Sequence, residues 1–219
     1  MRHRAVLFDL DGTLLDTLED LADSTNTALG SLGFAAHETA AYKYFVGGGI
    51  VDMARRALPA SRRDEATVAK LVQAMRRCYA EHWADRTRPY DGIPELLDAL
   101  AGRAVPMAVL SNKPDDSTKL MVQTLLPGRC FQAVLGARPN VPIKPDPAAA
   151  RQIAELLTVP AEEFCYLGDS GTDMKTAAAA GMYGVGALWG FRTAAELTDS
   201  GAKALIAHPR ELLALLEES

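Results

Sequence analysis

The stretch AVLFDLDGTLLDT, from Ala5 to Thr17, decides how the rest of this chain is expected to fold. Its first four residues are apolar and uncharged, which is typical of a parallel strand buried on both faces. Asp9 ends this run, Asp11 follows two residues later, and Gly12 marks a turn. Because ligands of α/β proteins bind at the carboxyl ends of parallel strands, both carboxylates are expected to face one crevice. A helix-capping Asp beside a turn Asp is the simpler alternative for the short DxDG element.

The composition of the chain is typical of a globular protein with a sizeable core. With 219 residues, 48% of them hydrophobic, it is long enough for one large domain or for a core with an inserted segment. The formal net charge of −5 argues against a nucleic-acid surface and against binding to an anionic membrane. Any site for a phosphate group must therefore be made positive locally.

Cysteine usage and the N-terminal sequence favour a cytoplasmic location. Cys78, Cys130 and Cys165 are far apart and form no CxxC pair, which indicates unpaired thiols in a reducing compartment. Two arginines precede the first apolar run, but Asp9 and Asp11 interrupt the apolar sequence, so no signal-peptide core is expected. No apolar run is long enough to span a bilayer.

Residues 16–86 carry helical patterns and no strong strand candidate. Asp16 is expected to cap the first helix and Ser61 the longest one, whose apolar residues recur at helical spacing. The expected helices cover residues 16–32, 38–45, 50–58 and 61–83. An α/β unit rarely spends so many residues on its first crossover, so this segment is expected to be an inserted, all-helical cap domain.

The rest of the chain alternates strand and helix signals, which predicts an α/β fold with a doubly wound parallel sheet. Strands are expected over residues 5–8, 105–110, 133–135, 164–167, 184–188 and 204–206. Helices are expected over residues 94–102, 117–125, 147–157 and 173–180, and after Pro209. The predicted domains are an α/β core over residues 1–15 and 87–219 and the helical cap over residues 16–86.

Three further segments place polar residues at or near strand ends. They are Ser111-Asn112-Lys113 after the strand at 105–110, Lys144 before the helix at 147–157, and Asp169 and Asp173 in the GDSGTD string after the strand at 164–167. Taken singly, these segments could be a helix N-cap, a solvated surface charge, and an N-cap Asp with a partner that the helix dipole favours.

Taken together, the same residues indicate a site for phosphoryl transfer. The four aspartates would converge at neighbouring strand ends, where two like charges about 4 Å apart repel by roughly 4 kcal/mol at an effective dielectric near 20. Such a cluster requires a cation to stay ionised, and oxygen-only ligands favour Mg²⁺, which also accepts substrate phosphate. Lys144 supplies a positive charge for a phosphoryl group, and Ser111 can donate a hydrogen bond to it.

In order and spacing, these motifs resemble those of the haloacid dehalogenase (HAD) superfamily, whose members are mostly magnesium-dependent phosphatases that act through an aspartyl phosphate. The resemblance covers the chain from Asp9 to Gly190, and no motif departs from the pattern. It implies a Rossmann-like HAD core, with residues 16–86 as a mobile helical lid over the active site.

The resemblance assigns roles to the four aspartates. Asp9 matches the nucleophile, which attacks phosphorus and forms an acyl phosphate. Asp11 matches the general acid/base, which protonates the leaving alkoxide and then activates water. The implied Mg²⁺ ligands are the Asp9 carboxylate, the main-chain carbonyl of Asp11, and Asp169. Asp173 is expected to hold these ligands in place rather than to bind the metal directly.

The resemblance also implies which residues hold the phosphoryl group, namely Ser111, Asn112 and Lys144. Ser111 and Lys144 count among the catalytic residues with Asp9 and Asp11, because Lys144 would offset the charge of the intermediate. Backbone N–H groups after Asp9 would add to this cradle.

Several strings resemble the phosphoglycolate-phosphatase-like branch of the superfamily: Thr13 after DLDG, Asn112-Lys113, YDGI from Tyr90, and Trp189-Gly190-Phe191-Arg192. The resemblance implies a small phosphomonoester as substrate, with 2-phosphoglycolate as the leading candidate. The loop from Gly47 to Gly49 would touch the substrate or be a plain helix–helix turn. Lys113 and Arg192 would bind a substrate carboxylate or be ordinary surface charges.

Two other functions stay open at this point. A phosphosugar mutase on the same scaffold would return the phosphate from Asp9 to a sugar. A non-catalytic binding protein would keep the fold without the reaction, although the intact set of motif residues argues against it. The expected partner is a small-molecule phosphate ester, with no nucleic acid and no membrane, and the chain is expected to be a monomer or a homodimer.

Overall fold

The computed structural model describes residues 3–217 and divides the chain into two compact units. The first, the core unit, comprises Met1–Leu15 and Pro89–Ser219. The second, the helical unit, comprises Asp16–Arg88 and is inserted after the first strand of the core unit. A two-stranded sheet of β2 (Leu15–Asp16) and β3 (Arg88–Pro89) forms where the chain crosses between the units.

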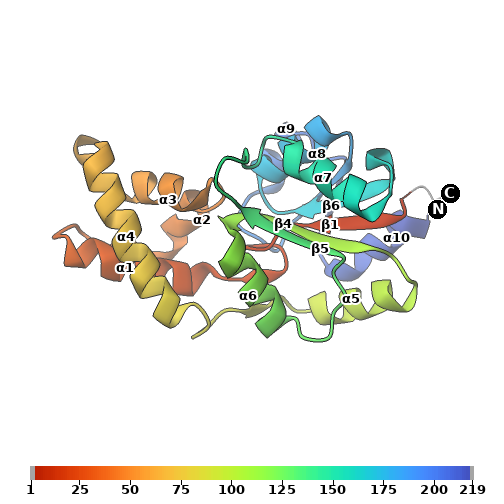
Figure 1. The fold of residues 1–219 in the computed structure, drawn as a ribbon, viewed down its shortest axis with the longest axis horizontal. Helices are drawn as coiled ribbons and strands as arrows, with labels where there is room; N and C mark the ends of the chain where they lie inside the picture. The colour runs from red at the N-terminus through yellow and green to blue at the C-terminus, as the bar shows by residue number, and fades with distance from the viewer. Residues whose placement is uncertain (1–2, 218–219) are drawn as a thin grey trace. The chain divides into compact units, whose positions relative to one another are not determined.

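The core unit is built on a six-stranded sheet, whose strands are drawn as arrows in Figure 1. Its strands are β1 (Ala5–Phe8), β4 (Met107–Pro114), β5 (Ala133–Ala137), β6 (Phe164–Gly168), β7 (Tyr183–Ala187) and β8 (Ala204–Ile206). Their order is β5-β4-β1-β6-β7-β8, and every neighbouring pair is parallel. From β1 the chain first adds β4 and β5 on one side of the sheet and then β6, β7 and β8 on the other. The point where this order reverses is where parallel sheets form a ligand crevice.

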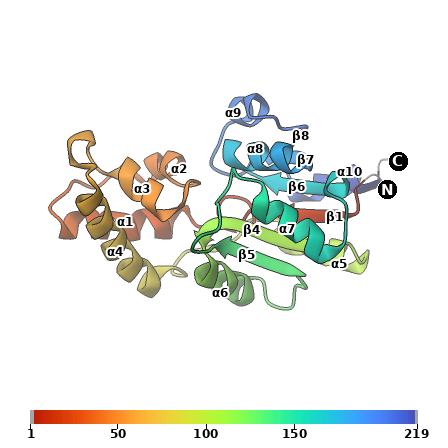
Figure 2. The ribbon, with the colours of Figure 1, turned by 45° about the horizontal axis from the view of Figure 1, so that its top comes forward.

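Helices cover both faces of this sheet, as the doubly wound prediction requires, and the predicted fold class is confirmed. They are α5 (Ile93–Gly102), α6 (Asp115–Leu125), α7 (Ala148–Leu157), α8 (Gly171–Ala180), α9 (Ala194–Asp199) and α10 (Leu212–Glu217), with short 3-10 turns at Ala161–Glu163 and Pro209–Glu211. Helices α7 and α8 lie on one side of the sheet, and α5 and α6 lie on the other (Figures 1 and 2).

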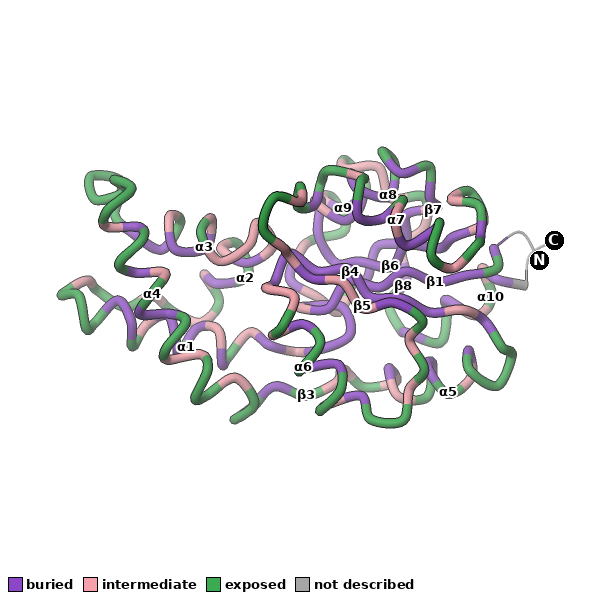
Figure 3. Tube along the Cα trace, viewed as in Figure 1, coloured by how far each residue is buried: buried purple, intermediate pink, exposed green. Residues whose placement is uncertain are grey.

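The central strand β1 is buried because its apolar residues face helices on both sides. All four of its residues have no exposed surface. Ala5 and Leu7 pack in a cluster with residues of α7 and α8, such as Ile153 and Ala177. Phe8 points to the opposite face, as the alternation of side chains along a strand requires. Figure 3 shows that the sheet strands form the buried interior while much of the helices' surface is exposed.

The helical unit contains four α-helices: α1 (Leu18–Ser31), α2 (Tyr42–Phe45), α3 (Gly49–Ala57) and α4 (Glu65–His82). Helix α4 packs against α1 and α3. Three residues of its apolar stripe, Val68, Leu71 and Met75, are buried. The outer members of the predicted stripe, Val72, Tyr79 and Trp83, are only half-buried.

Two helix caps predicted from the sequence are wrong. Helix α4 is capped by Asp64, whose carboxylate accepts a hydrogen bond from the Thr67 N–H at 2.9 Å, whereas Ser61 lies in a 3-10 turn (Ala60–Arg62). Helix α1 follows Thr17, because Asp16 belongs to β2. For α4 the path of the backbone selects Asp64 over Ser61. For α1 Thr17 occupies the cap position without a side-chain cap hydrogen bond, while Asp16 Oδ1 accepts from the Leu18 N–H at 3.5 Å.

The structure adds elements that the sequence patterns did not predict. Strand β4 continues beyond Leu110 to Pro114, with a shift of register against β5, so Ser111-Asn112-Lys113 extends the strand. Helix α9 and the short strands β2 and β3 carry too few periodic residues to be recognised. No helix within residues 3–217 combines the length and hydrophobicity that crossing a bilayer would need.

Candidate active site

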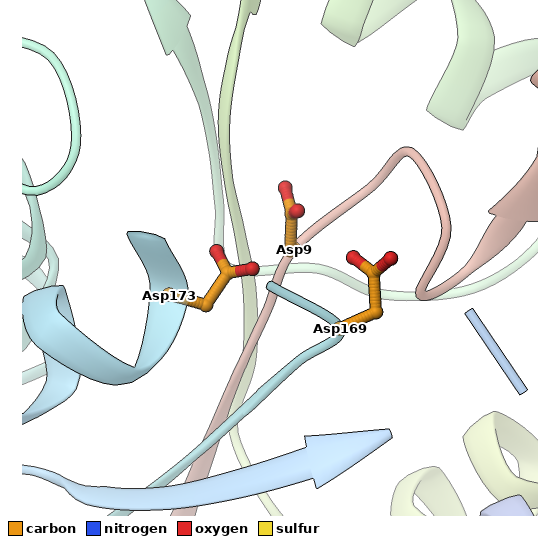
Figure 4. Close-up of side chains that lie close together, drawn as sticks. All are labelled: Asp9, Asp169 and Asp173. Carbon is orange, nitrogen blue, oxygen red and sulfur yellow. The ribbon is translucent and has the colours of Figure 1, made fainter. Parts of the chain in front are cut away.

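Three buried carboxylates meet at the carboxyl ends of β1 and β6. Asp9 directly follows β1, Asp169 directly follows β6, and Asp173 lies in the first turn of α8. One carboxylate oxygen of each residue can be chosen so that the three lie within 4.8 Å of one another, and Figure 4 shows the Asp9 side chain between those of Asp173 and Asp169. The two strands are neighbours, and the N–H of Asp9 donates to the carbonyl of Leu167 at 2.9 Å. Parallel pairing thus brings together residues 160 positions apart, which supports the predicted convergence.

The ammonium group of Lys144 lies inside this cluster. Its Nζ is 2.8 Å from Asp9 Oδ1 and 2.7 Å from Asp173 Oδ1, and it donates to the carbonyl of Leu110 at 3.1 Å. Lys144 stands in a turn with a cis Lys144–Pro145 peptide bond, and its side chain is 3% exposed. It is therefore not the solvated surface charge that a lysine before a proline usually is.

The electrostatics of the cluster show that it carries an excess of negative charge. Burial, and then the neighbouring Asp173, raise the pKa of Asp169 to about 7. Burial and Asp173 also raise the pKa of Asp9 well above its usual value, against the opposing effect of Lys144. Burial alone would lower the pKa of Lys144, but Asp173 and Asp9 raise it above its usual value, so this ammonium stays charged.

Asp173 is fixed by hydrogen bonds to both of its carboxylate oxygens. One oxygen, Oδ2, accepts from the N–H of Ser170 at 3.1 Å and from its hydroxyl at 2.5 Å, which makes a capping box at the start of α8. The other, Oδ1, accepts from Lys144 at 2.7 Å and from the Tyr166 hydroxyl at 3.3 Å. Asp173 is thus the first-turn partner in this capping box, with Ser170 rather than Asp169 as the N-cap, and its role in the site stays a prediction.

Asp169 is held by two segments far apart in the sequence. The N–H of Phe191 donates to its Oδ2 at 2.7 Å, and the Thr13 hydroxyl donates to its Oδ1 at 3.3 Å. The indole N–H of Trp189 donates to the Thr13 carbonyl at 3.0 Å and so ties these two segments together. Sequence reasoning noticed Thr13 and Trp189-Gly190-Phe191 only as marks of resemblance. Their contacts with Asp169 are a role that sequence reasoning missed.

Two glycines allow the backbone to approach Asp169 closely. A Cβ atom on Gly12 would collide with Asp169 Oδ2, and Gly12 also has a φ of +86°, which favours glycine. A Cβ atom on Gly190 would collide with the Asp169 side chain and with the Gly12 carbonyl. The turn after Asp11 is closed by a hydrogen bond from the Gly12 N–H to the Leu15 carbonyl at 2.9 Å.

Asp11 lies apart from the three-carboxylate cluster. Its Oδ1 is 2.8 Å from Lys113 Nζ, and the exposed fractions of the two side chains are 12% and 7%. Lys113 is therefore a buried, ion-paired residue and not an ordinary surface charge.

Ser111 and Asn112 are both buried at the end of β4. The Ser111 hydroxyl accepts a hydrogen bond from the Lys113 N–H at 3.2 Å. The Asn112 side chain donates to the carbonyl of Lys144 at 3.0 Å and accepts from its N–H at 2.9 Å. Asn112 thus holds the backbone that carries the catalytic lysine candidate. Its predicted contact with phosphate stays a prediction, as does that of Ser111.

The contacts of Arg192 and of the loop from Gly47 to Gly49 with substrate stay predictions. Arg192 has a largely buried side chain, with Nε 3.2 Å from Oε1 of Glu196, which lies four residues later in α9. In the predicted loop from Gly47 to Gly49, Gly47 and Gly48 lie between α2 and α3, and Gly49 is the first residue of α3.

The donor set of the cluster fits a hard divalent cation. Its three carboxylates and one ammonium leave two negative charges when all are ionised, and a divalent ion would balance them. The potential ligands are oxygens alone, which favours Mg²⁺ over softer metals.

Comparisons with known proteins agree with this geometry. The family model of haloacid dehalogenase-like hydrolases matches residues 6–187. A phosphoglycolate phosphatase of Pseudomonas syringae pv. tomato is 32% identical over 214 residues, covering 96% of this chain and 78% of that protein. A phosphoglycolate phosphatase of Aquifex aeolicus is 28% identical, covering 98% of this chain and 97% of that protein.

A solved structure shares the whole architecture. The crystal structure of a candidate phosphoglycolate phosphatase from Lactobacillus delbrueckii subsp. bulgaricus superposes with a TM-score of 0.93 at 29% identity, covering 99% of each chain. Since the family pattern spans most of the chain and its acidic residues meet at the predicted strand ends, this protein belongs to the haloacid dehalogenase-like hydrolase family, on its phosphoglycolate-phosphatase-like side.

Proposed function

We propose that this hydrolase is a magnesium-dependent phosphatase that cleaves a small phosphomonoester, 2-phosphoglycolate first among them, through an aspartyl phosphate on Asp9. The observation that carries the proposal is the position of Asp9. Its carboxylate is buried at the end of the central strand, 2.8 Å from the Lys144 ammonium and within a cluster of carboxylates suited to a divalent cation. Relatives similar over nearly the whole chain are phosphoglycolate phosphatases, which supports the substrate.

The residues that would hold Mg²⁺ are Asp9, Asp169 and the main-chain carbonyl of Asp11. Asp173 would hold the site together instead, because its two oxygens already accept four hydrogen bonds within the protein, whereas each oxygen of Asp169 accepts one. When bound, the metal supplies positive charge that draws the phosphate oxygens to Asp9 and offsets the carboxylates.

In the first step, a carboxylate oxygen of Asp9 attacks phosphorus, and the bond from phosphorus to the alkoxide breaks. Asp9 Oδ1 is engaged by Lys144 and by the Leu10 N–H at 2.7 Å, while no hydrogen bond to Oδ2 is found within the described residues. Oδ2 is therefore the oxygen best placed to react. Asp11 donates its proton to the leaving alkoxide, so the alcohol departs neutral.

In the second step, Asp11 takes a proton from water, and the water oxygen attacks phosphorus. The bond from phosphorus to Asp9 breaks, which releases inorganic phosphate and restores the carboxylate. Lys144 offsets the charge on the phosphoryl oxygens in both steps, and Ser111 donates a hydrogen bond to one of them. Asn112 supports Lys144 through its backbone.

We also propose that the enzyme works in the cytoplasm on a small-molecule ester. Cys78, Cys130 and Cys165 are all free thiols, which suits a reducing compartment.

The test is a panel of phosphate esters, with 2-phosphoglycolate and p-nitrophenyl phosphate included, assayed for phosphate release with and without Mg²⁺. We expect release to require the metal and Asp9→Asn to lower kcat on the order of 10⁴-fold or more, as loss of a nucleophile does. Asp199→Asn, an exposed change at the end of α9, serves as the matched control. Release by Asp9→Asn at the parental rate would overturn the nucleophile assignment, and isomer without free phosphate from a hexose phosphate would indicate a mutase.

A further inference from the structure

Tyr166 is a buried polar residue that the proposed reaction does not use. It lies in β6, three positions before Asp169, and has no exposed surface. Its hydroxyl donates to Asp173 Oδ1 at 3.3 Å, and the centroid of its ring is 5.9 Å from Lys144 Nζ. The side chain therefore contacts two members of the site at once, without belonging to the acidic cluster.

A hydroxyl at this position is not needed to fill the core. Phe164, two residues earlier, points to the same face of the sheet and packs in the same hydrophobic cluster. A phenylalanine at 166 would fill the same space without burying a polar group, and burying a polar group is unfavourable unless it is hydrogen-bonded. Within the described residues the Tyr166 hydroxyl donates to Asp173 and also interacts with the Lys144 ammonium, so both of these polar neighbours belong to the site. The presence of the hydroxyl thus points to a function for its hydrogen bond to Asp173.

The hydrogen bonds of Asp173 show what this function is. A carboxylate accepts about four hydrogen bonds, two at each oxygen. The Ser170 backbone and side chain occupy Oδ2, and Lys144 and Tyr166 share Oδ1. The Tyr166 hydroxyl is the fourth donor, so it completes the set that fixes the rotation of this carboxylate.

Lys144 depends on that rotation. Its ammonium group has three N–H bonds and three oxygen neighbours, namely the Leu110 carbonyl, Asp173 Oδ1 and Asp9 Oδ1. The Leu110 carbonyl is fixed by the sheet, and Asp9 is the proposed reacting group. Asp173 Oδ1 is therefore the side-chain contact that decides how the ammonium is aimed at Asp9.

We propose that Tyr166 is a positioning residue: its hydroxyl fixes Asp173, and Asp173 in turn holds the Lys144 ammonium against Asp9 and against the phosphoryl group that Asp9 receives. The contact chain Tyr166–Asp173–Lys144–Asp9 is a matter of geometry, while its kinetic consequence rests on the proposed phosphatase function. No hydrogen bond from the Tyr166 hydroxyl to the reacting atoms or to the proposed metal ligands is found within the described residues, so Tyr166 acts through Asp173 and Lys144.

The kinetic test is Tyr166→Phe, which removes one oxygen and keeps the ring beside Lys144. With p-nitrophenyl phosphate and Mg²⁺, we expect kcat to fall about 3- to 10-fold, the factor typical of losing one hydrogen bond. KM is expected to stay within about twofold, because the misaligned charge matters most in the transition state. Tyr183→Phe is the matched control, since it also removes a tyrosine hydroxyl, one that donates at 3.4 Å to the Lys203 carbonyl from the amino end of β7. An unchanged kcat for Tyr166→Phe, or an equal loss for the control, would overturn the proposal.

A second measurement does not depend on activity. The ¹⁵N resonance of the Lys144 ammonium, assigned by its loss in Lys144→Met, is expected to shift and to exchange faster with water in Tyr166→Phe than in the parent protein. An unchanged resonance would overturn the positioning role even if the enzyme were an active phosphatase. A parent protein inactive on the whole ester panel would instead overturn the proposed function and leave this measurement to decide the geometry.

If Tyr166→Phe fails to fold, the proposal can still be tested on the parent protein. A nuclear Overhauser effect is expected between the Tyr166 hydroxyl proton and the Lys144 ammonium, because both groups contact Asp173 Oδ1. Its absence, in a sample where both protons are observed, would overturn the proposal.

Discussion

Lys113 Nζ lies 2.8 Å from Asp11 Oδ1, and both side chains are largely buried. The lysine comes from the end of β4 and the aspartate from the turn after β1, two strands that pair directly. A fixed cation therefore orients the residue proposed as the general acid/base. Binding of a substrate carboxylate by Lys113 stays a prediction, while the ion pair already fixes the lysine beside Asp11.

Replacing Lys113 is expected to affect protonation of the leaving group. Lys113→Gln should lower kcat for an alkyl phosphate by about 10- to 100-fold, since general acid catalysis contributes roughly 10²–10⁴-fold and depends on alignment. The loss with p-nitrophenyl phosphate should be several-fold smaller, because nitrophenolate leaves without a proton. Steady-state kinetics with both substrates measures the difference.

Lys119→Gln is the control for this prediction. Lys119 pairs with Asp115 one turn along α6 at 2.7 Å, and its side chain is exposed. Its replacement should leave both rates unchanged. Equal losses with the two substrates for Lys113→Gln would contradict the assignment of Asp11 as the acid.

The stability of the metal-free protein should rise as the pH is lowered from about 8 to about 5. Burial and Asp173 raise the pKa of Asp169 to about 7, whereas in the unfolded chain it returns to about 3.8. Between these values the folded state binds more protons than the unfolded state, so the contribution of this group to stability is present at low pH and lost as the pH rises through 7. Thermal unfolding in the presence of a chelator at several pH values checks the direction.

Two comparisons sharpen the pH prediction. Asp169→Asn cannot titrate, so its Tm should depend less on pH over the same range. Asp9 titrates in the same direction, and Lys144 stays charged, so a part of the slope should remain. Mg²⁺ should bind more weakly below pH 7, where protons compete for Asp169. A parental slope in Asp169→Asn would show that another group is responsible.

Gly190→Ala is expected to weaken the metal site and to destabilise the protein by about 1–3 kcal/mol, the usual range for overpacking a buried position. The added Cβ would collide with Asp169 and with the Gly12 carbonyl, neither of which can move without shifting the site. Denaturant unfolding and Mg²⁺ titration by calorimetry measure the two effects.

Gly102→Ala supplies a control of opposite sign. Gly102 ends helix α5, and a Cβ there would meet nothing within 4 Å. Alanine should therefore stabilise the protein by up to about 1 kcal/mol through helix propensity and a less flexible unfolded chain. If Gly102→Ala also destabilised the protein, close packing at Gly190 would not explain the loss of stability in Gly190→Ala.

Asp20→Ala should destabilise the helical unit by about 2–3 kcal/mol, because it would leave buried N–H groups without acceptors. Asp20 is buried in α1 and accepts from the N–H groups of Arg86 and Thr87 and from the Thr87 hydroxyl, at 2.7–3.1 Å. Chemical denaturation followed by circular dichroism measures the change.

Asp23→Ala is the matched variant for Asp20→Ala. Asp23 faces Arg86 at 3.4 Å, and both side chains are more than half exposed. Its loss should change the free energy of unfolding by less than about 0.5 kcal/mol. A cost equal to that of Asp20→Ala would show that net charge, rather than hydrogen bonding, stabilises this unit.

The fold and the acidic residues of the site were predictable because their signals are local. An apolar run such as Ala5–Phe8 forms a buried strand wherever it occurs in a parallel sheet, and the polar residue after it falls at the carboxyl edge. This rule alone predicts that Asp9 and Asp169 lie close together. Helix caps were less predictable, since Ser61 and Asp64 are both good capping residues and the backbone path chose Asp64.

The roles of the supporting residues were not predictable, because they depend on which side chains meet across the sheet. Tyr166 is typical of a core residue, Thr13 of a turn residue and Phe191 of a loop residue. Only the pairing of β1 with β6 and the path of the loop after β7 bring their hydrogen-bonding groups to Asp173 and Asp169.

By itself, therefore, the sequence determined the alternating fold, the helical insertion and the acidic residues that meet at the strand ends, since each follows from hydrophobic periodicity and from residue types in a short window. The tertiary structure alone decided that Lys144 binds Asp9 and Asp173, that Lys113 binds Asp11, and that Thr13 and Phe191 hold Asp169. The physical reason is that hydrogen bonds and ion pairs require a separation of about 3 Å. Strand register and loop path set that separation between residues far apart in the chain.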